Sequence, residues 1–179
     1  MPILILYSSE KGSTGEIANR ISSRIAEQLP PTEVHNIHDF DASRLDDYTA
    51  IVLGSCIHNM HWLPEAKAFL TANKNALISK PLFAFSVGAA GSMPKFVRAQ
   101  SMKSEEKKMA HDVQKALDKK VKLHALFNGK VEKKDEPWLM RCCCGMLGGL
   151  TYGDLREWEK VDAWADEVVK DLKGSAEEH

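Results

Sequence analysis

The feature that most constrains the fold is the opening stretch of the chain, residues 3–18. Its four consecutive aliphatic residues, Ile3–Leu6, are too short a run for a helix and predict a strand buried on both faces, as in the centre of a parallel sheet. After a short loop, Glu16 is followed by isoleucines at a spacing of four, which predicts an amphipathic helix. We therefore expect a strand, a loop and a helix.

The loop is rich in hydroxyl groups, and its glycine permits a tight turn or the close approach of a ligand. It leads into a helix N-terminus, where free N–H groups and the positive end of the helix dipole converge, so we expect it to bind a phosphate monoester. The alternative is an ordinary turn in which Ser13 or Thr14 is the N-cap. The loop residues are Ser8, Ser9, Glu10, Lys11, Gly12, Ser13 and Thr14.

Two further apolar runs, Ala50–Ser55 and Pro81–Val87, each precede a segment of unusual composition. Residues 56–63 hold two histidines, an asparagine and a tryptophan, whereas residues 88–92 are all glycine, alanine or serine. Because ligands of open parallel sheets bind at the carboxyl ends of the strands, we expect both segments to flank a binding site.

The rest of the chain completes an α/β pattern. Five strands that alternate with helices predict one parallel sheet of order 2-1-3-4-5 in a single domain over residues 1–173. We expect an apolar insert at about residues 132–153 and a frayed tail over residues 174–179. The other predicted elements are strands at 33–37 and 121–131 and helices beginning at Pro64, over 104–120 and over 155–172.

The segment Ser9–Thr14 resembles the T/S-x-T-G-x-T loop of flavodoxins, which wraps the phosphate of flavin mononucleotide (FMN) after the first strand. It matches neither the dinucleotide fingerprint G-x-G-x-x-G nor a P-loop. The resemblance implies a flavodoxin-like three-layer sandwich with FMN as cofactor. The binding residues that it implies are Ser9, Glu10, Lys11, Gly12, Ser13, Thr14, Ser55, Cys56, His58, Asn59, Trp62, Val87, Gly88, Ala89 and Gly91.

In flavodoxins an aromatic side chain of the second loop stacks on the flavin ring, and Trp62 or His58 is the candidate counterpart here. The alternative is that Trp62 packs beneath the helix that begins at Pro64. His58 and His61 are the titratable groups that we expect near the ring, although no residue is assigned a catalytic role. A metal site is not expected, because the two histidines have no third partner.

Within the flavodoxin superfamily the chain is most similar to the menaquinone-dependent protoporphyrinogen dehydrogenase type. The similar segments are Gly54–His58 with His61, the apolar insert, and Asp154–Val161. This implies an FMN-dependent oxidoreductase that exchanges electrons with a small or lipophilic substrate, a porphyrinogen or a quinone. The alternatives are an electron-carrier flavodoxin that serves a redox protein, and a flavodoxin-like domain that has lost its cofactor.

Charge and hydropathy narrow these classes. The net charge of −1 over 179 residues gives no general attraction to nucleic acid, so we expect no such partner. Electron carriers are usually strongly acidic, because charge steers them to basic partners, so a charge near zero favours an enzyme. No apolar run approaches the ~20 residues needed to span a bilayer, and we expect a cytoplasmic protein.

The insert contains the apolar, glycine-punctuated segment Pro137–Leu150. We expect either a helix that covers the sheet edge or a surface for an oligomer, quinone or membrane contact. The four cysteines, Cys56, Cys142, Cys143 and Cys144, fit neither a disulfide framework nor a C-x-x-C site, so reduced thiols are expected. The contiguous three have no assigned role.

Overall fold

A computed structural model describes residues 2–29, 31–132, 134 and 149–177. Within them, five parallel strands pair in the order β2-β1-β3-β5-β6. This confirms the predicted sheet, because β5 and β6 are the fourth and fifth of the long strands. The five strands are β1 (Ile3–Ser8), β2 (Thr32–Asn36), β3 (Ala50–His58), β5 (Leu82–Gly88) and β6 (His124–Asn128).

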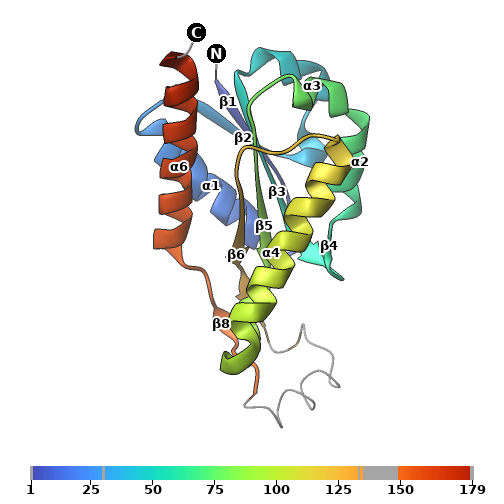
Figure 1. Ribbon diagram of the computed structural model, residues 1–179, viewed down its shortest axis with the longest axis vertical. Coiled ribbons are helices and arrows are strands. Elements are labelled where there is room, and N and C mark those ends of the chain that lie inside the picture. The colour runs from blue at the N-terminus through green and yellow to red at the C-terminus, as the bar shows by residue number, and fades with distance from the viewer. Residues whose placement is uncertain (1, 30, 133, 135–148, 178–179) are drawn as a thin grey trace.

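Helices cover both faces of the sheet, which gives three layers (Figure 1). The helices α1 (Ser13–Ala26) and α6 (Trp158–Glu177) lie on one face. The opposite face carries α2 (Pro64–Ala72), α3 (Lys74–Ile78) and α4 (Lys95–Leu117). Short 3₁₀ turns are η1 (Ile37–Asp39), η2 (Ala42–Asp47) and η3 (Ala90–Ser92).

The strand β1 shows how the apolar runs build two cores. Successive side chains of a strand point to opposite faces, so Leu4 and Leu6 join the core beneath α2 and α4, whereas Ile3 and Ile5 join the core beneath α1 and α6. All four are at most 2% exposed. Burial of each stabilises the fold by about 1.5–3 kcal/mol, which explains a run with no polar alternation.

A row of three serines crosses the sheet close to the carboxyl ends of β1, β3 and β5. Ser8 pairs in register with Ser55, and Ser55 pairs with Ser86. All three are fully buried, and each hydroxyl is hydrogen-bonded. The row holds the segment after β3, because Ser8 donates to Glu65 (2.6 Å) and Ser55 accepts from the backbone N–H of Leu63 (3.2 Å).

Several predicted elements have different bounds in the structure. Residues 56–63 were expected to be a loop, but β3 continues to His58 and turns back into β4 (His61–Trp62), which forms an antiparallel hairpin. The helix expected at residues 104–120 begins at Lys95, directly after Pro94. The last helix, α6, runs to Glu177 and so includes part of the expected tail.

A second small sheet closes the end of the molecule at which β6 terminates. It pairs β7 (Lys130–Val131) with β8 (Gly153–Asp154), and Leu155 donates its N–H to the carbonyl of Gly129. The predictions for Pro137–Leu150 and for Cys142, Cys143 and Cys144 fall almost entirely on residues 135–148, which lie outside the described residues.

Candidate functional site

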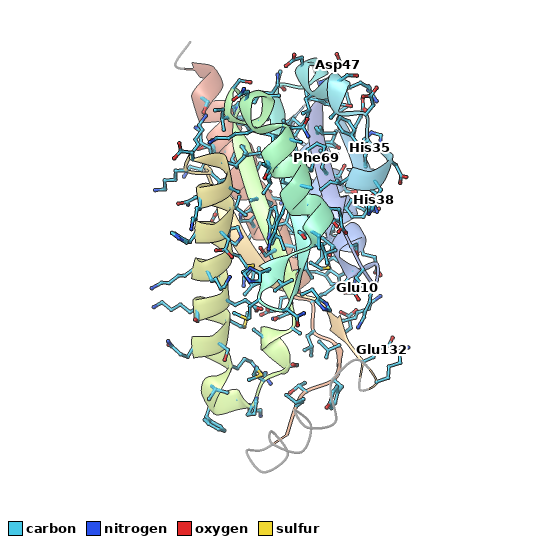
Figure 2. The ribbon with its side chains drawn as sticks, turned by 90° about the vertical axis from the view of Figure 1, so that its right-hand side faces the viewer. Glu10, His35, His38, Asp47, Phe69 and Glu132 are labelled. Carbon is cyan, nitrogen blue, oxygen red and sulfur yellow. The ribbon has the colours of Figure 1, made fainter. Side chains whose placement is uncertain are left out.

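A cleft of about 560 Å³ opens at the carboxyl ends of four parallel strands, β1, β3, β5 and β6. Figure 2 shows Glu10 and Glu132 toward this end of the molecule, whereas Asp47 lies at the opposite end. The lining residues are Ser9, Glu10, Lys11, Ser13, Thr14, Cys56, Ile57, His58, Asn59, Val87, Gly88, Ala89, Gly129, Lys130 and Val131.

The first wall is the loop between β1 and α1. Gly12 has a φ of 90°, a left-handed conformation that favours glycine, and it is the N-cap residue of α1. Its N–H donates to the hydroxyl of Ser9 at 3.0 Å. The alternative in which Ser13 or Thr14 caps the helix is therefore wrong, and both hydroxyls are left for other partners.

Thr14 provides the most specific chemistry of this wall. Its Oγ1 is buried and has no hydrogen-bond partner, although buried polar atoms are nearly always paired. The neighbouring Ser13 hydroxyl accepts from the N–H of Lys130 (3.3 Å). An anionic oxygen at the α1 N-terminus would accept from Thr14 and from the free N–H groups of the first turn, so the residues present fit a phosphate ester.

The second wall is the hairpin of β3 and β4. His58 lies against Glu10 of the first wall, with 3.3 Å between Nδ1 and the carboxylate. Asn59 and Met60 form the two-residue turn, and both have positive φ angles, 49° and 61°. This is the twist that short hairpin loops require. This contact joins the hairpin to the phosphate-suited loop.

Trp62 does not line the cleft. It is 4% exposed and its indole N–H donates to Ser86 at 2.7 Å, so its ring packs within the core. The prediction that Trp62 stacks on a ligand is wrong, and the packing alternative is correct. His61 also points elsewhere, because its Nδ1 lies 3.4 Å from Asp112 on α4.

The thiol of Cys56 is part of the same wall. Burial raises the pKa of this thiol, which favours the neutral form. A neutral thiol is a weak nucleophile, so this burial does not activate Cys56.

The third wall is the end of β5 and the turn that follows. Val87, Gly88 and Ala89 line the cleft. Gly91 lies behind it, where its N–H donates to the buried side chain of Asn128 at 2.9 Å. A Cβ on Gly91 would come within 2.4 Å of the Asn128 oxygen, so this glycine permits the close contact that holds the turn.

Eleven of the fifteen predicted residues therefore line one cleft. The four that do not are Gly12, which shapes the first wall, Ser55 and Trp62 in the core, and Gly91 behind the third wall.

The fourth wall of the cleft follows β6 and was not predicted from the sequence. This wall consists of Gly129, Lys130 and Val131. One further lining residue that was not predicted, Ile57, belongs to the hairpin of the second wall. Lys130 contributes a cation, which pairs with Glu16 in the first turn of α1 at 2.9 Å. The signal was present, because the carboxyl end of every strand in a parallel sheet meets the same rim, and the fifth strand had been predicted.

The described residues contain no group of three His, Cys, Asp or Glu side chains arranged to hold a metal ion. Nor does any helix among them combine the length and apolarity needed to cross a membrane.

The sheet order, the helices on both faces and the phosphate-suited loop after the first strand define a flavodoxin-like protein. The family model of the flavodoxin domain matches residues 4–157. The chain therefore belongs to the flavodoxin family, and its cofactor is FMN.

One relative in sequence and two solved structures show which individual proteins this chain is similar to. Protoporphyrinogen IX dehydrogenase [quinone] of Escherichia coli K12 is 25% identical over 175 residues, which cover 94% of this chain and 95% of that protein. Rubredoxin oxygen:oxidoreductase of Desulfovibrio gigas superposes with a TM-score of 0.64 at 15% identity, over 97% of this chain but only 36% of that one. Flavodoxin 1 of Bacillus cereus gives 0.57 at 18% identity, over 95% and 98%. These structural likenesses establish the fold.

Proposed function

We propose that FMN lies in the cleft at the carboxyl ends of the strands. Its phosphate binds the N–H groups at the start of α1 and the hydroxyl of Thr14, and its ring lies between the hairpin at Asn59 and the turn at Ala89. The orphaned Thr14 Oγ1 is the observation that supports this placement, because a phosphate oxygen supplies the missing partner.

Bound there, FMN supplies the redox chemistry, and the protein binds and orients it. Lys130 places a positive charge beside the loop. His58, which contacts Glu10, is the histidine among the residues that line the cleft. The cleft thus positions a flavin without a dedicated general base.

We further propose that the chain is an FMN-dependent oxidoreductase for a small or lipophilic substrate of the porphyrinogen or quinone kind, acting in the cytoplasm. The nearly full-length similarity to the E. coli dehydrogenase supports this class. The net charge of −1 supports it independently, because a carrier that relies on electrostatic steering needs a strong field.

The second candidate function is that of an electron-carrier flavodoxin. The superposition of this chain on flavodoxin 1 of B. cereus, which covers almost the whole of both chains, favours this candidate. The two functions are separated by loading the purified protein with FMN, reducing the flavin without oxygen, and mixing it with a quinone or with an iron–sulfur or heme protein. We expect rapid reoxidation by the quinone, and quinone-dependent conversion of protoporphyrinogen to protoporphyrin. Fast transfer to the redox proteins alone would establish the carrier.

The cofactor position has a test of its own. Thr14→Val keeps the shape of the side chain and removes the hydroxyl, so we expect the Kd for FMN to rise by about tenfold, the equivalent of one hydrogen bond. Ser23→Ala is the matched control, because this exposed hydroxyl of α1 bonds only its own helix at Asn19. An unchanged Kd for Thr14→Val would place the phosphate elsewhere.

A further inference from the structure

A second and larger cavity, of about 800 Å³, adjoins the proposed flavin cleft. The two share Ile57, Asn59 and Ala89 as lining residues. The other residues of the second cavity are Met60, Ala90, Ser92, Met93, Phe96, Val97, Gln100, Ser101, Ser104, Glu105 and Leu150. Most of them come from the hairpin, the turn after β5 and the first three turns of α4, and Leu150 precedes β8. This cavity therefore lies beside the flavin site and not within it.

Most of the residues that line this second cavity are apolar. Among the described residues, Met60 and Phe96 are the large hydrophobic side chains that remain most exposed, 45% and 69%, and both line this cavity. Exposed apolar side chains that gather around one concavity mark a binding site for an apolar partner. The volume is within the range of sites for small organic ligands.

Glu105 is the one ionisable residue among the described residues of this lining. It is 8% exposed, and its Oε2 is buried without a hydrogen-bond partner. A Cβ on Gly88 would lie only 2.8 Å from that oxygen, so the carboxyl group stands directly behind the strand end that lines the flavin cleft. Leaving such a group unpaired costs stability, and a bound ligand that pairs with it removes this cost.

We propose that the second cavity binds an uncharged, ring-shaped redox substrate of the quinone class, and that Glu105 forms the hydrogen bond that orients it beside the flavin. This inference rests on the proposed function. It adds the position at which the substrate binds and a residue, Glu105, that determines substrate specificity.

The residues that line the second cavity indicate which class of ligand it binds. None of the lining residues is a lysine or arginine, so nothing among them pairs with the phosphates of a nicotinamide cofactor or the carboxylates of a porphyrinogen. Burial raises the pKa of Glu105, which favours a neutral carboxyl group that both donates and accepts. A quinone oxygen accepts such a hydrogen bond, and the hydroxyl of a hydroquinone donates one.

The test uses the FMN-loaded protein and a short-chain ubiquinone analogue as the probe. We expect Glu105→Leu to raise the Kd for this quinone by about tenfold, whereas Glu105→Gln stays within about threefold because an amide also forms hydrogen bonds. Ser101→Trp fills the cavity and is expected to weaken quinone binding to at least the same degree. Glu106→Gln is the matched control, because Glu106 is the next residue of α4 and accepts from the N–H of Leu126 instead.

Each variant is first titrated with FMN. Failure of the wild-type protein to bind FMN would refute the proposed function itself. With FMN bound, the inference is overturned if wild type binds no quinone, if Glu105→Leu and Ser101→Trp both leave the quinone Kd unchanged, or if Glu105→Leu weakens FMN instead, since the carboxyl group would then belong to the cofactor site. Tighter binding of a sulfonated quinone than of the uncharged probe would also overturn it.

Discussion

At the scale of single residues, Met60 carries backbone strain. Its φ of 61° is left-handed, a conformation that costs a non-glycine residue about 1–2 kcal/mol. We expect Met60→Gly to raise the free energy of unfolding by about 1 kcal/mol in urea titrations. Asn59→Gly is the control and should gain less, because asparagine tolerates this conformation. A loss of stability in Met60→Gly would mean that the packing of the methionine outweighs the strain.

A second residue-scale prediction concerns His124, whose Nε2 lies 3.0 Å from the hydroxyl of Ser86. Burial lowers the pKa of His124 to about 4 from an ordinary 6.5. Between these values the unfolded chain binds a proton that the folded protein does not, so stability is complete above pH 6.5 and falls as the pH drops toward 4. The loss amounts to about 2–3 kcal/mol.

His124→Gln removes the titrating group and retains a side chain able to bond Ser86. We expect its unfolding free energy to depend less on pH between 6.5 and 4 than that of wild type, as measured by urea titration at several pH values. Parallel curves for the two proteins would show that His124 does not titrate with folding.

Residue types predicted which segments meet at the site, but not which way each side chain points. Neighbours in a strand face opposite ways, so once residues 61 and 62 form β4, one of the two must enter the core. Trp62 is buried and His61 exposed, because the indole gains more from burial. The hairpin itself lacked a signal, since a methionine at a left-handed turn position contradicts local preference.

At the scale of elements, Arg156 ties the segment after β8 to the start of α1. Its guanidinium binds Asp154 through two nitrogens, at 2.8 and 2.6 Å, and Glu16 at 2.6 Å. It also lies 4.5 Å from the ring centre of Trp158, and its side chain is only 5% exposed. The arginine holds the pKa of Asp154 at about 2.

We expect Arg156→Lys to lower the free energy of unfolding by about 1–3 kcal/mol, because an ammonium group cannot reproduce the planar two-nitrogen contact. Arg20→Lys is the matched control, since its pair with Asp162 also joins distant elements but is 52% exposed on the arginine side. The free energy of unfolding of this control, measured by urea titration, should fall by at most about 1 kcal/mol. Equal losses would show that burial does not distinguish the two arginines.

Element boundaries were predictable only where the local pattern matched the packing. Residues 104–106, Ser-Glu-Glu, have the acidic composition of a helix start, yet α4 begins at Lys95 because Pro94 ends the preceding turn. Glu105 therefore lies in the interior of a helix and is buried, which a pattern of charges does not reveal. The strands β1, β3 and β5 begin within one residue of the prediction, since buried parallel strands must be continuously apolar. The strand expected at 121–131 is shorter, because β6 covers only His124–Asn128 and β7 pairs with β8 in another sheet.

At the scale of the whole molecule, the site couples cofactor binding to folding. The cleft draws on the ends of β1, β3, β5 and β6, and none of these ends lies near the others in an unfolded chain. FMN should therefore bind the folded protein alone and stabilise it by about 2.7 kcal/mol at a concentration of 100 times Kd. For a chain of 179 residues this raises Tm by about 5–10 °C.

Riboflavin, which has the same ring without the phosphate, isolates the contribution of the first wall. Thermal unfolding with equal concentrations of the two ligands should show a clearly smaller rise in Tm with riboflavin, and Thr14→Val should reduce the difference between them. If riboflavin stabilises the protein as much as FMN does, the phosphate makes no contact with the loop, and the walls around Asn59 and Ala89 supply the whole binding energy.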